Sequence, residues 1–186
     1  MTGTIILRIK LVGLAKNYRF GLFEFYYSFN QKKNMGLMSF LKGVGEKVFK
    51  KEEAATPAAE AEPLRASALL AHVKALGLTY KTIQVKTSGD KVTLEGEVEK
   101  QADAERIALA VGNVEGVSEV DNNMKVAESA PEATYYTVKS GDSLSKIAKE
   151  VYGDMKKYPQ IFEANKPMLS DPDKIYPGQV LRIPKE

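Results

Sequence analysis

The chain has 186 residues, of which 44% are hydrophobic and 27% charged, enough for one medium domain or two small ones with packed cores. It contains no cysteine, which excludes a disulfide scaffold, a zinc finger, an iron–sulfur protein and a thiol nucleophile, and it has a single histidine, His72. The formal net charge is +3, but residues 1–34 alone carry +5 and the remaining residues carry −2, so nucleic acid is not the expected partner of the body of the protein.

Residues 1–34 differ in character from the rest of the chain. They hold seven of the sixteen aromatic residues, and their longest uncharged runs are about seven residues. A membrane-spanning helix needs about 20 apolar residues, and the early charges Arg8 and Lys10 also argue against a signal peptide. We therefore expect Met35 to be the biological start and residues 1–34 to be a non-native upstream extension. The alternative is a basic, aromatic tag for a membrane surface.

A short amphipathic helix is predicted over residues 35–51. Its apolar residues recur at helical spacing: Leu37, Phe40, Leu41, Val44 and Val48. Gly43 and Gly45 each weaken such a helix by about 1 kcal/mol relative to alanine, so we expect it to dock on a membrane or on the next domain. Residues 52–62, rich in alanine, glutamate and proline, have the composition of a linker.

The first domain is predicted over residues 63–127. Helical spacing around Leu69 ends at Gly77, and alternating strands over 83–87 and 92–98 are joined by a turn at Gly89. A second helix ends at Gly112-Asn113, and a last strand covers 120–126. The predicted order is αββαβ, and we interpret His72, beside the apolar stripe of the first helix, as a packing residue.

The second domain is predicted over residues 134–186, after a short linker at 128–133. A strand at 135–139 leads into a turn in which Asp142 is placed to cap the next helix. Two helices follow, and Pro177-Gly178 turns the chain into a closing strand over 180–183. The predicted order is βααβ, and the whole is an α+β protein with two small domains.

Several stretches carry a resemblance to known families. Residues 136–148 (YTVKSGDSLSKIA), 161–165 (IFEAN) and 175–184 (IYPGQVLRIP) resemble a LysM domain. Residues 63–127, with VTLEGEV at 92–98 and VGNVEGV at 111–117, resemble a BON domain. In this order, behind MGLMSFLKGVGEK at 35–47, they resemble the family of small, cytoplasmic bacterial potassium-binding proteins. The resemblance covers residues 35–186 and none of 1–34.

This resemblance implies a cytoplasmic potassium sensor or buffer that is monomeric and not an enzyme. By similarity, K+ is held by the backbone oxygens of Leu41, Val44, Gly112, Val114 and Val117. Backbone carbonyls suit K+, and the end of a helix supplies carbonyls that lack intrahelical partners. Ion binding would then dock the N-terminal helix and compact the two domains. Without the resemblance, Gly112 and Gly116 would be interpreted as a helix stop and a tight turn.

Other functions stay open on the sequence alone. LysM domains commonly bind peptidoglycan or other N-acetylglucosamine glycans, and the resemblance places such a groove between two turns: Gly141, Asp142, Ser143 and Leu144 on one side, Lys174, Ile175 and Tyr176 on the other. A BON domain also suggests contact with phospholipid. An enzyme is a remote option, because pairs such as Glu95 and Glu97 are better explained as a solvated row of charges on a strand.

Overall fold

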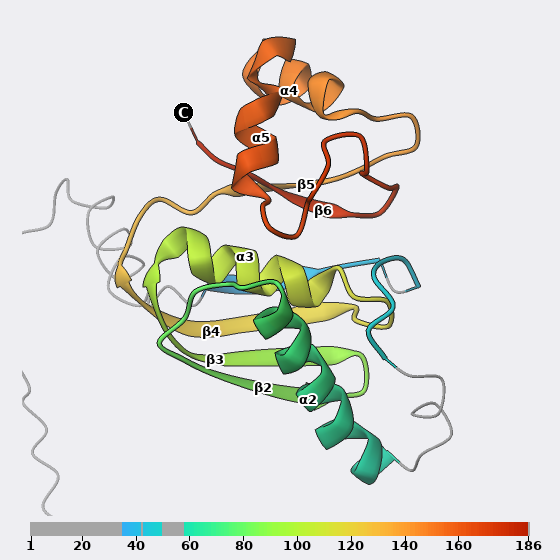
Figure 1. The fold of residues 1–186 in the computed structure, drawn as a ribbon, viewed down its shortest axis with the longest axis vertical. Helices are drawn as coiled ribbons and strands as arrows, with labels where there is room; N and C mark the ends of the chain where they lie inside the picture. The colour runs from blue at the N-terminus through green and yellow to red at the C-terminus, as the bar shows by residue number, and fades with distance from the viewer. Residues whose placement is uncertain (1–34, 42, 50–57, 186) are drawn as a thin grey trace, which may run out of the picture. The chain divides into compact units, whose positions relative to one another are not determined.

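The computed structural model describes residues 35–41, 43–49 and 58–185 (Figure 1). The elements in chain order are β1 (Met35–Ser39), α2 (Ala58–Ala75), β2 (Thr82–Ser88), β3 (Lys91–Lys100), α3 (Gln101–Gly112), β4 (Glu119–Glu128), β5 (Thr134–Thr137), α4 (Leu144–Tyr152), the 3-10 turn η2 (Met155–Lys157), α5 (Tyr158–Ala164) and β6 (Val180–Ile183). The α+β class and the orders αββαβ and βααβ are confirmed. The proposed upstream extension, residues 1–34, lies outside the described residues.

The first domain is a four-stranded sheet in the order β1-β4-β3-β2, covered by α2 and α3 (Figure 1). Strands β2 and β3 form an antiparallel hairpin, whereas β3 and β4 are parallel and are connected by α3. A parallel pair needs such a crossover. The helices and the sheet share one core, to which Leu69, Leu94 and Ile107 contribute fully buried side chains.

The N-terminal helix predicted for residues 35–51 is wrong where the structure describes this segment. Residues 35–39 form the edge strand β1, paired antiparallel with β4. Beyond it, Gly43 has φ 95° and Gly45 has φ 135°, values that a right-handed helix does not allow. The open edge of β4 offers a row of backbone hydrogen-bonding groups, and pairing with it outweighs a short helix already weakened by two glycines.

The linker predicted at 52–62 is also shorter than expected, because α2 begins at Ala58. Its alanines and glutamates are good helix formers, and the hydroxyl of Thr87 donates to the carbonyl of Glu62 at 2.8 Å, which fixes this turn of the helix on β2. Residues 52–57 lie outside the described residues.

The second domain pairs β5 with β6 antiparallel and covers one face of the pair with α4 and α5 (Figure 1). Ser143, not Asp142, caps α4 and accepts a hydrogen bond from the amide of Lys146 at 3.3 Å. Asp142 instead closes the preceding turn, where its carboxylate accepts from the amide of Lys139 at 2.8 Å. The predicted cap was therefore one residue out of place.

Both faces of strand β6 are buried, one against the core of each domain. Leu181 and Ile183 belong to the core of the second domain, whereas Val180 belongs to the core of the first. Because alternate residues of a strand point to opposite faces, β6 lies between two packed layers.

Candidate functional site

Two segments that are distant in sequence run side by side at the end of α3. They are the N-terminal segment, residues 40, 41 and 43–49, and the α3–β4 loop, residues 113–118. The amide of Phe40 donates to the carbonyl of Ser118 at 2.8 Å, and that of Glu46 donates to the carbonyl of Asn113 at 2.9 Å. The amide of Glu115 returns a bond to the carbonyl of Glu46 at 2.9 Å, which completes a parallel bridge.

Two glycines allow this close approach. A Cβ on Gly112 would lie 1.9 Å from Cζ of Phe40, so the ring of Phe40 rests on the bare backbone at the end of α3. A Cβ on Gly45 would lie 2.1 Å from the carbonyl oxygen of Asn113. Real Cβ atoms do not approach so closely, so both positions exclude any other residue without a shift of the backbone or the ring. Gly116, with φ 95°, supplies the turn.

The five residues predicted as ion ligands all come from these two segments or from the end of α3. The structure places Leu41 and Val44 in the N-terminal segment, Gly112 at the end of α3, and Val114 and Val117 in the α3–β4 loop. The carbonyl of Leu41 accepts from the amide of Val44 at 3.3 Å, and that of Val114 accepts from the amide of Val117 at 3.1 Å. A carbonyl oxygen has two lone pairs, so each keeps capacity for a second partner.

The side chains around the loop have other tasks. Val114 and Val117 are buried in the core of the first domain. Arg65 lies over the ring of Phe49, 4.5 Å from its centroid, and its Nη2 donates to the carbonyl of Gly116 at 3.3 Å. Within the described part of the chain, no group of three or more histidine, aspartate or glutamate side chains is placed to hold a metal ion.

A pocket of about 260 Å³ adjoins the N-terminal segment and the α3–β4 loop. Glu46, His72 and Asn113 line it from the first domain, and Tyr176 and Gln179 from the second. The side chain of His72 is 9% exposed, as expected for a packing residue, and its Nε2 lies 3.8 Å from Oε2 of Glu46. Burial, and secondarily the charge of Glu46, raise the pKa of the Tyr176 hydroxyl above its usual value.

The two turns of the predicted glycan groove lie at the same end of the β5–β6 pair, because one follows β5 and the other precedes β6. Several of their polar groups are already engaged within the turns. The carboxylate of Asp142 accepts from the hydroxyl of Tyr136 at 3.0 Å, and the carbonyl of Gly141 accepts from Nζ of Lys146 at 2.8 Å. Burial first, and then the Asp142 contact, raise the pKa of Tyr136.

The apolar groove residues Leu144 and Ile175 pack in or against the core of the second domain. Ser143 is the helix cap described above, and the side chain of Lys174 is largely exposed. Of the seven predicted groove residues, Lys174 and Tyr176 line the pocket that faces the N-terminal segment.

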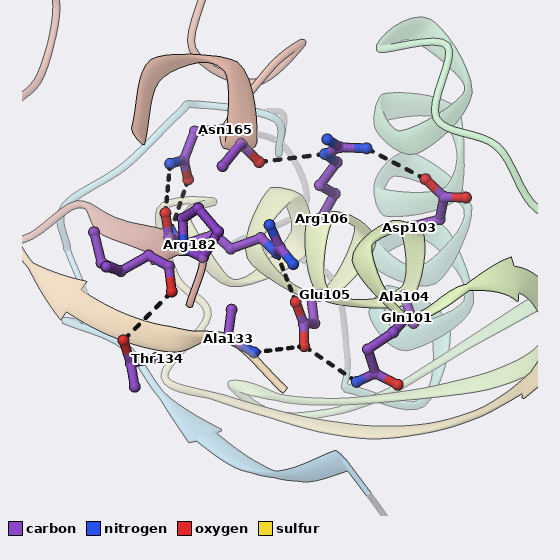
Figure 2. Close-up of polar contacts among 12 residues, drawn as sticks. Gln101, Asp103, Ala104, Glu105, Arg106, Ala133, Thr134, Asn165 and Arg182 are labelled. Atoms are coloured by element: carbon purple, nitrogen blue, oxygen red, sulfur yellow. Dashed lines mark hydrogen bonds and ion pairs between the residues drawn. The ribbon is translucent and has the colours of Figure 1, made fainter. Parts of the chain in front are cut away.

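Polar contacts across the domains were not anticipated from the sequence (Figure 2). Glu105, fully buried on α3, accepts from Nε of Arg182 on β6 at 2.6 Å. The other carboxylate oxygen accepts from the amide of Ala133 and from Nε2 of Gln101, both at 3.1 Å. The last residue of the predicted 128–133 linker is thus held against α3. Nε of Arg106 also donates to the carbonyl of Ala164 at 3.2 Å.

Asn113 is the second unanticipated residue. Its Nδ2 donates to the carbonyl of Val180 at 2.9 Å, and its Oδ1 accepts from the amide of Val180 at 2.8 Å. The sequence signal was the Gly112-Asn113 pair, which correctly marked the end of a helix. Nothing local in the sequence indicated a partner 67 residues away.

Comparison with known proteins gives two domain families and two similar proteins. The BON domain family matches residues 63–128 and the LysM domain family matches residues 136–184. The potassium binding protein Kbp of Escherichia coli is 44% identical over 153 residues, covering 82% of this chain and all of that protein. An uncharacterized protein of Deinococcus radiodurans is 40% identical over 131 residues, covering 64% of this chain and 51% of that protein. Among the described helices, none combines the length and hydropathy needed to cross a membrane.

Proposed function

The chain belongs to the family of potassium binding protein Kbp, and from this premise we propose that it is a cytoplasmic potassium-binding protein, a sensor or buffer of K+. The observation that carries the proposal is the meeting of the N-terminal segment with the α3–β4 loop, where hydrogen bonds tie Phe40 to Ser118 and Glu46 to Asn113 and Glu115. This arrangement gathers main-chain groups from two parts of the chain. No covalent chemistry is needed for such a role.

The proposed ligands are the backbone oxygens of Leu41, Val44, Gly112, Val114 and Val117. Gly112 lies in the last turn of α3, where helix carbonyls lack intrahelical partners and carry the negative end of the helix dipole. Neutral carbonyl oxygens replace the hydration shell of K+ without the charge density that favours smaller divalent ions. The described part of the chain offers no competing cluster of acidic side chains.

Ion binding is proposed to be coupled to assembly. Oxygens from separate segments surround one ion only while the N-terminal segment stays docked on the α3–β4 loop, so binding stabilises the docked state by linkage. Since Leu41 and Val44 also border Gly178 of the second domain, the docked segment contacts both domains. K+ binding would therefore bring the BON and LysM domains together.

Thermal unfolding of the full chain in KCl and in NaCl at equal ionic strength tests this proposal. At about one hundred times its dissociation constant, a ligand of the native state adds about 2.7 kcal/mol, which raises the melting temperature by several degrees. A potassium-specific rise is expected, and identical curves would contradict the proposal.

A matched pair of variants locates the site. Gly43 and Gly45 both have positive φ, so an alanine at either position carries backbone strain, but only a Cβ at Gly45 would collide with the carbonyl of Asn113. We expect Gly45→Ala to lose the potassium response and Gly43→Ala to keep it. An equal loss in both would point to the strain rather than to the contact with the loop.

Glycan binding through the LysM domain is the second candidate, with phospholipid contact by the BON domain beside it. It is supported by the LysM match and by the two turns gathered at one end of β5–β6. Titration with N-acetylglucosamine oligomers, followed by NMR of the amides of Gly141 and Tyr176, tests it. Shifts in these amides without any response to K+ would make glycan binding the better account.

A further inference from the structure

Asn113 takes part in two different arrangements, one with its side chain and one with its backbone. The side-chain amide makes a two-point contact with the backbone of Val180, donating through Nδ2 at 2.9 Å and accepting through Oδ1 at 2.8 Å. Asn113 is 6% exposed, so these bonds are shielded from water. Each buried partner left unsatisfied would cost more than the net value of one hydrogen bond.

The backbone of the same residue lies in the α3–β4 loop, next to the proposed ion ligands. Its carbonyl accepts from the amide of Glu46, and its amide donates to the carbonyl of Leu109 at the end of α3. It stands between Gly112 and Val114, two of the proposed ligands. Because backbone and side chain share one Cα, a change in the loop that moves the Asn113 backbone also moves the group that holds β6.

We propose that Asn113 is a positioning residue that couples occupancy of the ion loop to the placement of the LysM domain. This inference rests on the proposed function. K+ at the α3–β4 loop fixes the backbone at Asn113, and the fixed side chain then holds the edge of β6 at Val180. Asn113 contributes no proposed ligand atom, so it acts through the neighbouring carbonyls rather than on the ion.

The other polar contacts between the domains described above, made by Glu105 and Arg106, do not combine these features. Glu105 holds Arg182 and Ala133, but it lies near the start of α3, about two turns before the loop. Its contacts attach the domains whether or not the loop is occupied. Asn113 is therefore the interdomain contact expected to sense the ion.

The chain contains a matched control. Asn165 holds Arg182 in the way that Asn113 holds Val180, with Nδ2 donating to the carbonyl of Arg182 at 2.8 Å and Oδ1 accepting from its amide at 2.7 Å. This contact lies wholly within the second domain. Asn165→Ala therefore removes the same chemistry from the same strand without touching the ion loop.

The test follows two amides by NMR during a titration of the full chain with KCl at constant ionic strength. The amide of Gly116 reports on the ion loop, and hydrogen exchange of the Val180 amide reports on the contact with Asn113. In the unmodified chain, K+ should shift the Gly116 signal and slow exchange at Val180. In Asn113→Ala, the Gly116 shift should persist with affinity weakened by about tenfold at most, while exchange at Val180 becomes independent of K+. Asn165→Ala should retain both responses.

Each alternative outcome is informative. Potassium-dependent protection of Val180 that survives in Asn113→Ala would overturn the coupling role, and so would complete loss of the Gly116 response, which would make Asn113 part of the ion site itself. Asn113→Asp keeps the acceptor for the Val180 amide but places an oxygen against the Val180 carbonyl, and serves where the alanine variant does not fold; it is expected to uncouple in the same way. No shift of Gly116 in the unmodified chain would instead refute the proposed function.

Discussion

One edge of strand β6 is held at two points by the same chemistry, which comes from two different domains. Asn113 and Asn165 are the C-cap residues that follow α3 and α5. Each makes a two-point contact with one residue of β6: Asn113 with Val180, and Asn165 with Arg182. Together they occupy the amides and carbonyls of two alternate residues along the strand. Exposed strand edges invite unwanted pairing, and here two side chains cover the edge.

The difference between the two contacts lies in what each asparagine is attached to. Asn165 caps a helix of the LysM domain, so its contact is complete within that domain. Asn113 caps a helix of the BON domain, so the edge at Val180 is covered only while the domains are docked. The edge of β6 is therefore covered partly from within the LysM domain, by Asn165, and partly by the BON domain, through Asn113.

The largest expected effect comes from the second attachment of β6 to the BON domain. Glu105→Ala removes the buried partner of Arg182 and also the acceptor for Ala133 and Gln101. Breaking a buried ion pair by removing one member costs about 3–5 kcal/mol of unfolding free energy. Urea unfolding followed by circular dichroism measures it.

Glu95→Ala is the control for this variant. Its ion pair with Lys86 is also 2.6 Å long but is exposed to solvent, and such surface pairs contribute about 0–1 kcal/mol. If the two variants lost equal stability, burial of Glu105 would not be what makes its contact strong, and the BON side of β6 would be held by Asn113 and apolar packing alone.

The order of elements in both domains was predictable because it depends on local patterns. Helical spacing and strand alternation indicated αββαβ and βααβ, and turn residues such as Gly89 and Gly178 marked the boundaries. Residues 35–39 were predicted wrongly as helix because a run this short does not separate helical from strand periodicity. Their conformation was decided by the open edge of β4, whose paired residues lie 80 to 87 positions further along the chain.

The candidate site was predictable only in part, for the same reason. Gly112 was singled out as the end of a helix, but its need to be glycine comes from the ring of Phe40, and that of Gly45 comes from the carbonyl of Asn113. The run Val180–Ile183 indicated a strand but not that its alternate residues face two cores. Contacts between distant segments leave little trace in either local sequence.

The second largest loss of stability is expected from a change at the end of α3, in the BON domain. Gly112→Val would drive its side chain into the ring of Phe40, and such overpacking costs about 1–3 kcal/mol. The displaced ring should undock the N-terminal segment, so the potassium response in thermal unfolding should be lost while the LysM domain stays folded.

A double-mutant cycle supplies the control. Phe40→Ala removes the ring, so Gly112→Ala should cost less stability in that background than in the unmodified chain. Equal costs in both backgrounds would show that the ring contact is not the reason for glycine at this position.

Asn165→Ala tests the contact that holds β6 from within the LysM domain. This change leaves the backbone groups of Arg182 and the carbonyl of Ile161 without the buried amide that bonds to them, which should cost about 1–3 kcal/mol. Hydrogen exchange should show the loss in α4, α5 and β6 but not in β2 or β3. Equal loosening of β2 and β3 would mean that the two domains unfold as one unit, which would remove the distinction between the contacts.

The smallest effect is expected at alkaline pH and comes from Tyr136, which is not part of the β6 edge held by Asn113 and Asn165. The pKa of Tyr136 is raised by burial and then by its hydrogen bond to Asp142, so the folded domain favours the neutral phenol. Its contribution to stability is fully present below the unfolded pKa of about 10 and is lost as pH rises through the higher folded value. The unfolding free energy of the LysM domain should therefore fall above about pH 10, and Tyr136→Phe should flatten that fall.

Because Tyr136 contacts Asp142 and Glu150 within its own domain, the interdomain protection of Val180 should not follow this titration. If protection of Val180 fell in step with it, the β5 turn would be part of the coupling and Asn113 would not act alone.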